Sequence, residues 1–176
     1  MTKRPETLAL TLDRIDSPVG EVLLVVDAEG AVRALDFSDY EARMHRLLAR
    51  HYERYSLSDG RAPEAVRAAV AAYFAGDATA LDGLVVRTGG TDFQREVWAA
   101  LRAIPAGETR SYGQLAAAIG RPKAVRAVGL ANGQNPIGVI VPCHRVIGAN
   151  GTLTGYAGGV QRKQWLLDME RGVSER

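Results

Sequence analysis

The run Ile-Val-Pro-Cys-His-Arg-Val-Ile at residues 140–147 constrains the fold most. Pro142 lacks a backbone N–H and has a fixed φ, so an ordinary central strand cannot continue through Cys143. Cys143 is the only cysteine, and a lone cysteine among apolar residues is usually a small buried hydrophobe. His144 and Arg145 follow it directly, and positive charge near sulfur favours the thiolate. We therefore hypothesise that Cys143 is a nucleophile. Neighbouring side chains of a helix or strand do not face each other, so either the backbone turns here or a water connects thiol and imidazole.

Chain length and cysteine usage limit the class of protein. A chain of 176 residues forms one large domain or two small ones and can bury a sizeable core. No apolar run approaches the length of a membrane span, and Asp13 interrupts the first apolar segment too early for a secretory signal. One cysteine excludes an internal disulfide, and a working thiol requires a reducing compartment. We expect a cytoplasmic protein with no membrane association.

Basic side chains are concentrated in the half that carries the cysteine. Residues 1–90 have 11 Lys and Arg against 14 Asp and Glu, whereas residues 91–176 have 11 against 6. A solvated surface explains most imbalances of this kind, but a basic half also suits a polyanionic partner. The charge distribution leaves nucleic-acid binding open without requiring it.

The first half has the pattern of an antiparallel meander followed by helices. Short β-type runs alternate with turn residues, and two stretches of helical spacing come after them. The expected strands are residues 8–12, 21–26 and 31–37, and the expected helices are residues 39–55 and 63–75. His45 and His51 lie on a charged amphipathic helix with no metal-ligand constellation around them, so we expect both at the surface or half-buried. Glycine-rich residues 82–92 join the two halves.

The second half opens with two helices that have clear start signals. Thr91 or Asp92 caps the first, and its apolar stripe places Trp98 in the core, where a Trp at such spacing usually lies. Ser111 and Gln114 then form a capping-box pattern ahead of an apolar run. Each signal predicts a helix that begins within a residue or two of its cap.

Residues 111–132 have the pattern of a helix-turn-helix. Gly120-Arg121-Pro122 stops one short helix, and a second one restarts after it. On the second helix Val125, Val128 and Gly129 share the inner face. The outward face carries cations among small or apolar residues: Lys123, Arg126, Ala127 and Leu130. Such a face can approach a nucleic-acid groove with Arg126 as its main projection, although helical hairpins without a DNA role are common.

The segments around the thiol supply a turn, a glycine-rich wall and an acid. Asn135 precedes a proline and forms a turn that leads into residues 137–142, a short strand ending at the thiol. Glycines are dense from residue 148 to 159, as in a mobile loop or in a wall that approaches a flat ligand closely. On the last helix, residues 160–171, Glu170 falls on the apolar face. It needs a buried partner, which is either His144, for which Glu170 would be the orienting acid, or an arginine.

These motifs together resemble the O6-alkylguanine-DNA alkyltransferase family, also called methylated-DNA–protein-cysteine methyltransferases. The resemblance covers residues 91–176 and rests on three segments besides Asn135-Pro136: Pro142-Cys143-His144-Arg145-Val146, Gly155-Tyr156-Ala157-Gly158-Gly159 and Lys163-Gln164-Trp165-Leu166-Leu167. It implies an α+β fold with an N-terminal α/β domain and a small antiparallel sheet, residues 1–85. It also implies a mainly helical C-terminal domain with the helix-turn-helix and the active-site cysteine, residues 91–176.

The resemblance implies binding of double-stranded DNA through the minor groove and flipping of an alkylated guanine. Cys143 then accepts the alkyl group, His144 acts through a water, and Glu170 orients the histidine. Asn135 is the hinge between recognition helix and active site, and Tyr112 lies beside the flipped base and donates a proton to it. Arg126 replaces the extruded base. Further DNA contacts fall on Lys123, Ala127 and Gly129, and the pocket wall on Val146, Tyr156, Ala157 and Gly158.

The implied activity is direct-reversal repair in which each molecule acts once, because no residue is placed to break the resulting thioether. We expect no cofactor and no metal, because the structural zinc site that some relatives carry in the first half cannot form from thiols in a first half without cysteine. We also expect a monomer. Gly138 stands where the family usually has a proline, which leaves the alkyl-size preference open. Activity on O4-alkylthymine, cooperative binding along DNA and the fate of the alkylated protein also stay open. The alternatives are a non-repairing sensor of alkyl lesions, whose relatives lack the cysteine, and a Cys-His-Glu hydrolase.

Overall fold

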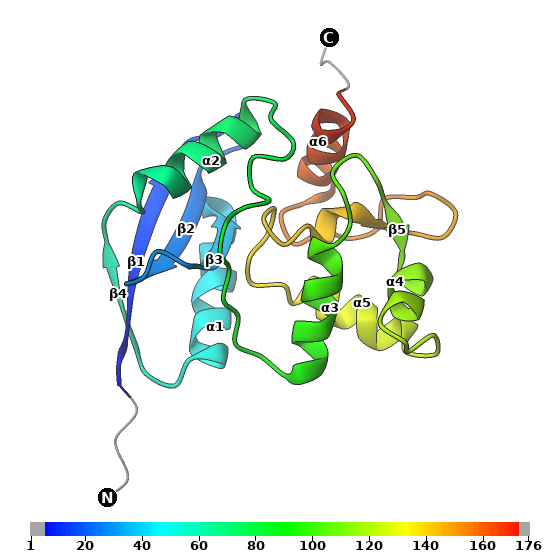
Figure 1. The fold of residues 1–176 in the computed structure, drawn as a ribbon, viewed down its shortest axis with the longest axis horizontal. Coiled ribbons are helices and arrows are strands. Elements are labelled where there is room, and N and C mark those ends of the chain that lie inside the picture. The colour runs from blue at the N-terminus through cyan, green and yellow to red at the C-terminus, as the bar shows by residue number, and fades with distance from the viewer. Residues whose placement is uncertain (1–5, 173–176) are drawn as a thin grey trace, which may run out of the picture.

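The structure, a computed structural model, describes residues 6–172. A four-stranded sheet of order β3-β2-β1-β4 occupies one side of the molecule, and a mainly helical part carries the C-terminal half beside it (Figure 1). In the first part the elements are β1 (Leu8–Ile15), β2 (Val22–Asp27), β3 (Val32–Phe37), η1 (Ser38–Tyr40), α1 (Glu41–His51), β4 (Tyr55–Asp59) and α2 (Glu64–Phe74).

Both faces of the sheet are covered, and the side chains of β2 show how. Leu23 and Val25 pack in a small cluster with Met44 and Leu48 of α1. The alternate residues Val22, Leu24 and Val26 point to the opposite face, into the main core, where α2 also packs. Because successive side chains of a strand alternate between faces, a sheet covered on both sides buries its central strand completely. All six residues of β2 are accordingly buried, which explains why this strand shows no alternation of polar residues.

The predicted meander is confirmed for three strands, but the sheet is mixed and not purely antiparallel. β1 pairs antiparallel with β2, and β2 pairs antiparallel with β3. The expected helix 39–55 ends at His51, and residues 55–59 form β4, which pairs parallel with β1. Alternation of Tyr55 and Leu57 with serines is the strand signal that the longer helical pattern hid.

The described residues of the second part form four α-helices, one short 3₁₀ helix and one small parallel ladder. Its elements are α3 (Asp92–Arg102), β5 (Arg110–Ser111), α4 (Tyr112–Ala118), α5 (Val125–Gly133), η2 (Cys143–Arg145), β6 (Val146–Ile147) and α6 (Val160–Glu170). The predicted capping box at Ser111 is confirmed, because its side chain accepts from Gln114 N. Of the two cap candidates for the preceding helix, Thr91 is the cap, and its side chain accepts from Gln94 N in a capping box that was not predicted. The ladder of β5 with β6 fixes the chain immediately after the thiol.

The main core runs through both halves of the described chain. Trp98 is buried in it, as expected, and its indole N–H donates to the carbonyl of Ala131 at 2.9 Å. Leu35 of β3 forms an isolated bridge with Ile137, so the sheet edge touches the segment that leads to Cys143. His45 is exposed and His51 half-buried, as predicted. No helix in residues 6–172 is long and apolar enough to cross a membrane.

Candidate active site

The segment before the thiol is a series of tight turns, so the predicted strand over residues 137–142 is wrong. The side-chain amide of Asn135 donates to the carbonyl of Val141 at 2.7 Å, and its oxygen accepts the N–H of Ile137 at 3.0 Å. Ile140 N donates to Gly138 O across Val139, whose φ is 70°, an unfavourable conformation for a β-branched residue. Burial of Val139 and the Asn135 hydrogen bonds hold this strained backbone in place.

Pro142 ends these turns and Cys143 begins the short helix η2. Cys143 N donates to Val141 O at 2.8 Å, so the chain turns at Pro142 as the sequence suggested. The thiol side chain is buried, with only 5% of the residue exposed. Burial raises the pKa of the Cys143 thiol above its ordinary value, and the Asn135 side chain and the charges of Arg43 and Lys163 offset only part of that effect.

The expectation that positive charge on His144 and Arg145 favours the thiolate is wrong. The Arg145 guanidinium donates to both carboxylate oxygens of Glu170 at 2.9 Å and to the carbonyl of Ile104 at 2.6 Å. Burial lowers the pKa of His144, against the opposing effect of its hydrogen bond to Glu170, so this imidazole is neutral at physiological pH. The charged groups that act on the sulfur are instead Arg43 and Lys163, which sequence reasoning did not assign.

The predicted contact between His144 and Glu170 is present. Nε2 of His144 lies 2.8 Å from Oε2 of Glu170, and both side chains are fully buried. Burial would raise the pKa of Glu170, but the hydrogen bonds and charges of His144 and Arg145 outweigh it and lower that pKa to about 2. An ionised carboxylate only accepts, so Nε2 carries the proton and Nδ1 has a free lone pair. That Nδ1 is buried without a hydrogen-bond partner among residues 6–172.

Two further buried groups reach this site without any sequence signal that assigns them. The hydroxyl of Tyr73, on α2, donates to Oε2 of Glu170 at 2.6 Å. Nζ of Lys163, on α6, donates to the carbonyl of Val146 at 2.6 Å, and burial lowers its pKa. Tyr73 lies in an apolar helical stretch whose spacing indicates only core packing, and Lys163 lies among polar residues, where a lysine is normally exposed. Their roles become visible once the tertiary contacts are known.

The pocket at the thiol is small, about 10 Å³. Of the four predicted wall residues, Tyr156, Ala157 and Gly158 line it together with Cys143, but Val146 does not. A Cβ added at Gly158 would lie 2.9 Å from the ring of Tyr156 and 3.0 Å from that of Phe37, so only glycine fits. This volume has room for about one water, and a purine enters only after the wall has moved.

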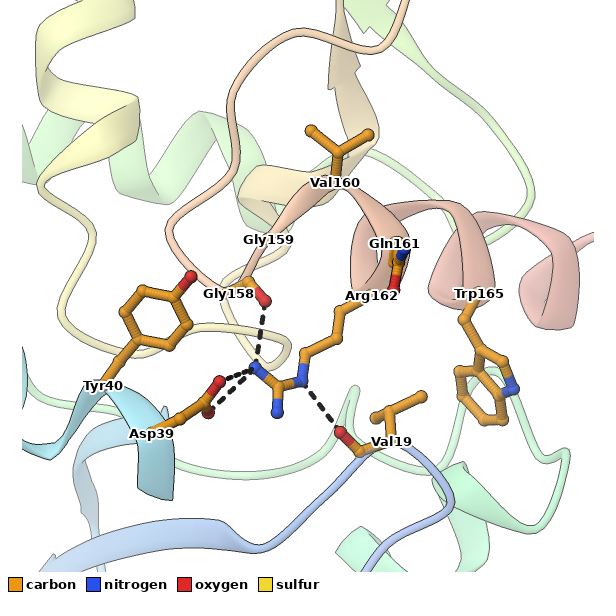
Figure 2. A pocket seen from close by; sticks show the side chains of 9 residues that line it. All are labelled: Val19, Asp39, Tyr40, Gly158, Gly159, Val160, Gln161, Arg162 and Trp165. Carbon is orange, nitrogen blue, oxygen red and sulfur yellow. Dashed lines mark hydrogen bonds and ion pairs between the residues drawn. The ribbon is translucent and has the colours of Figure 1, made fainter.

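A larger hollow of about 620 Å³, which Gly158 also lines, lies between residues of the two halves of the chain (Figure 2). Arg162 of α6 spans the junction beside it. Its guanidinium donates to the carbonyls of Val19 and Gly158 and to the carboxylate of Asp39, at 2.8, 3.1 and 2.9 Å. It also stacks over the ring of Phe37, 4.2 Å from the centroid. Arg162 therefore ties the wall of the thiol pocket to the first half of the chain.

The predicted recognition surface is exposed, with two corrections: Lys123, predicted on the second helix, lies in the turn just before α5, and Val125 is not on the inner face. Lys123, Arg126 and Ala127 are exposed as expected, and so is Leu130, at 64%. Val125, expected on the inner face, is 40% exposed, because the helix begins at Val125 and its first turn projects from the core.

Two other predicted residues, Gly129 and Tyr112, connect α4 with α5 and with the loop between β6 and α6. A Cβ at Gly129 would meet the ring of Tyr112 at 3.7 Å, so α4 and α5 pack closely there. The hydroxyl of Tyr112 lies 2.6 Å from that of Thr154. In residues 6–172 no group of three His, Cys, Asp or Glu side chains could hold a metal ion. The site as a whole is suited to chemistry at a buried thiol beside a histidine–carboxylate pair.

Comparisons with known proteins agree with this arrangement. A family model described as 6-O-methylguanine DNA methyltransferase, DNA binding domain, matches residues 92–172. The methylated-DNA–protein-cysteine methyltransferase of Salmonella typhimurium is 54% identical over 165 residues, which cover 93% of this chain and 96% of that protein. A relative of the same name from Mycobacterium tuberculosis is 49% identical over 160 residues, 89% of this chain and 90% of that protein. The crystal structure of Mycobacterium tuberculosis OGT in complex with DNA matches with a TM-score of 0.76 at 43% identity, over 93% of this chain and 94% of that one.

The matched relatives share nearly the whole chain, including the half that carries the sheet. The chain therefore belongs to the methylated-DNA–protein-cysteine methyltransferase family. Its fold is the α+β fold of that family.

Proposed function

We propose that this protein repairs O6-alkylguanine in double-stranded DNA by transferring the alkyl group to Cys143, once per molecule. The observation that carries the proposal is the buried thiol of Cys143 followed by His144, whose ring is held by Glu170 at 2.8 Å. Family membership supports the same reaction, because the relatives are named for methyl transfer from DNA to a protein cysteine.

The chemistry follows from the types of group present. The thiol proton passes through a water to the free Nδ1 of His144, and the imidazolium that forms is stabilised by Glu170. The thiolate sulfur attacks the alkyl carbon, a C–S bond forms, and the bond from that carbon to guanine O6 breaks. Tyr112 donates a proton to the purine, which makes the guanine a better leaving group. A thioether is stable, so the alkyl group stays on Cys143.

The α4–α5 pair would dock in the minor groove as a helix-turn-helix. Lys123, Ala127 and Gly129 would contact the backbone, and small side chains there let the helix come close. Arg126 would occupy the space of the extruded guanine. The flipped base would then meet the wall of the thiol pocket, with backbone carbonyls of Cys143 and Val146 at its exocyclic amine and N–H groups near Ala157 at O6.

Entry of the base requires the pocket wall to move, since the closed pocket holds about one water. Asn135 would act as the hinge between α5 and the thiol, because its side chain closes the turns that connect them. The carbonyl of Val146 already accepts from Lys163, so its second lone pair would serve the guanine amine.

The remaining features of the proposal concern organisation and location. Residues 1–85 and 91–176 would act as an N-terminal α/β domain and a C-terminal DNA-binding and transfer domain. The protein would work as a monomer in the cytoplasm, where thiols stay reduced. A non-repairing sensor would have no use for a thiol beside a histidine–carboxylate pair, and a hydrolase would turn over repeatedly.

Reaction stoichiometry tests the proposal. The protein is mixed with an excess of duplex DNA containing one O6-methylguanine, and restored guanine is measured with time. We expect restored guanine to level off at one per protein molecule, and none with Cys143→Ser. Continued turnover would identify a hydrolase-like enzyme, and binding without restoration would identify a sensor.

A further inference from the structure

The first half of the chain contributes one side chain to the histidine–carboxylate pair. Tyr73 lies near the end of α2, is completely buried, and donates its hydroxyl to Oε2 of Glu170 at 2.6 Å. The next residue, Phe74, packs against Trp165 of α6 with ring centroids 6.0 Å apart. In Figure 1, α2 and α6 lie at the same end of the molecule, one on each side of the junction between the halves. Two adjacent side chains of α2 thus dock on α6 at the level of the site.

The hydrogen bonds on Glu170 make the Tyr73 hydroxyl more than a packing contact. Oε2 accepts from three donors, namely Tyr73, His144 and Nη2 of Arg145. Oε1 accepts from Nε of Arg145. Arg145 makes a bidentate contact with the two carboxylate oxygens and so fixes the plane of the carboxylate. Tyr73 and His144 both bond to Oε2. The strength of the bond from Glu170 to His144 therefore depends on how much of that oxygen Tyr73 occupies.

We propose that Tyr73 is a positioning residue for the alkyl transfer, which sets the basicity and orientation of His144 through Glu170. This inference rests on the proposed function, and it makes the N-terminal half part of the reacting system. Removal of the Tyr73 hydroxyl leaves Oε2 of Glu170 with two donors. Oε2 then attracts the proton on His144 more strongly. The pKa of His144 should then rise, and the carboxylate loses one of the contacts that fix it.

Other charged or titratable groups around His144 come from three segments and remain in place when Tyr73 is changed. They are Cys143 and Arg145 of η2, Lys163 and Glu170 of α6, and Tyr156 of the pocket wall. Arg145 and Lys163 both oppose protonation of His144, and Glu170 favours it. A change of the hydroxyl at position 73 therefore acts mainly through Glu170.

The experiment compares Tyr73→Phe with Tyr55→Phe, which removes a hydroxyl from β4 at the far edge of the sheet. The chain has three histidines, so NMR titration can follow each ring, and His144→Gln identifies the signal of His144. Methyl transfer from O6-methylguanine duplex is measured in single turnover as a function of pH, and binding of the same duplex is measured separately. Site-specific replacement of Tyr73 by a fluorinated tyrosine keeps the ring and strengthens the donor.

In Tyr73→Phe we expect a higher pKa of His144, an acid limb of the rate profile moved to higher pH, and a transfer rate about tenfold lower on that limb. DNA binding should stay unchanged, and Tyr55→Phe should match wild type. The fluorinated tyrosine should lower the pKa of His144. An unchanged His144 pKa and rate profile in both Tyr73 variants, with normal transfer by wild type, would overturn the inference alone. Absence of transfer by wild type would overturn the proposed function, and with it the role of Tyr73 in the reaction.

Discussion

The side-chain amide of Asn135 donates a 2.7 Å hydrogen bond to the backbone carbonyl of Val141, two residues before the thiol. One side chain therefore closes the whole series of turns that connects α5 with Cys143. The backbone between these two residues includes Val139 in a left-handed conformation, which no local preference would maintain. The place of the sulfur thus depends on an amide that lies eight residues earlier in the chain.

Asn135→Ala should lower the free energy of unfolding by about 2 kcal/mol, because the buried carbonyl of Val141 and the N–H of Ile137 lose their partners. It should also slow alkylation of Cys143 by iodoacetamide, since the Asn135 side chain is one of the groups that hold the thiol pKa down. Urea unfolding and the iodoacetamide rate check the two effects. Asn150→Ala, in the exposed loop after β6, is the control and should change neither. Wild-type stability in Asn135→Ala would contradict this account of the turns.

Glu170→Gln should be strongly destabilising, by about 3 kcal/mol, because the buried guanidinium of Arg145 loses its counter-ion. The amide keeps the shape of the side chain but cannot accept from Tyr73, His144 and Arg145 together. Transfer should slow more than DNA binding weakens. Thermal unfolding and single-turnover transfer check these outcomes, and Gln164→Ala on the exposed face of α6 is the control. Equal losses of transfer and of DNA binding would point to general unfolding.

Stability should fall as the pH is lowered, in two stages. The pKa of His144 is lowered by burial, so the unfolded chain binds a proton near the ordinary value of 6.5 when the folded protein does not. Glu170 has its pKa lowered to about 2 from an ordinary 4.5, so its contribution is complete above 4.5 and is lost as the pH falls towards 2. Urea unfolding across this range measures both. In His144→Gln the loss of stability that begins near pH 6.5 should be smaller. If the free energy of unfolding depends on pH there as steeply as in wild type, this loss does not come from His144.

Arg162→Ala should loosen the wall of the thiol pocket. The substitution removes the contacts of the guanidinium with Val19, Asp39 and Gly158, which together bind the wall to the first half. We expect a loss of about 2 kcal/mol in stability and faster iodoacetamide alkylation of the buried thiol. Arg61→Ala, which removes an exposed ion pair with Glu64 at the start of α2, should leave both unchanged. Slower alkylation in Arg162→Ala would contradict the idea that this residue holds the wall closed.

Lys123→Ala and Arg126→Ala should weaken DNA binding in different ways. Lys123 would contact phosphate, so its loss should affect all sequences alike and lower the slope of log affinity against log salt by about one. Arg126 would fill the gap in the duplex, so its loss should impair transfer more than binding of undamaged DNA. Titrations at several salt concentrations and single-turnover transfer separate the two. Arg61→Ala should behave as wild type, and identical effects of both substitutions would contradict the separate roles.

Local signals predicted the parts of the fold that depend on nearby residues. The capping residues Thr91 and Ser111 marked their helices because a cap acts within three residues. A buried partner for Glu170 was also predictable, since a carboxylate on an apolar helix face needs one. The two alternatives, His144 and an arginine, are both present, the arginine being Arg145.

Contacts across long separations could not be predicted in the same way. Tyr73 donates to a carboxylate 97 positions later, and nothing in its own helix distinguishes it from a core tyrosine. The parallel pairing of β4 with β1 depends on tertiary packing. The expected effect of Arg145 on the thiol failed because sequence proximity does not fix direction, and its guanidinium turns to Glu170.

The most direct test of the central claim is the intact mass of the protein after reaction with duplex DNA containing one O6-methylguanine. Wild type should gain the mass of one methyl group, located by peptide mapping on the peptide that contains Cys143, and Cys143→Ser should gain none. A wild type that binds the lesion with no change of mass, or that carries the methyl group on another residue, would contradict transfer to this thiol.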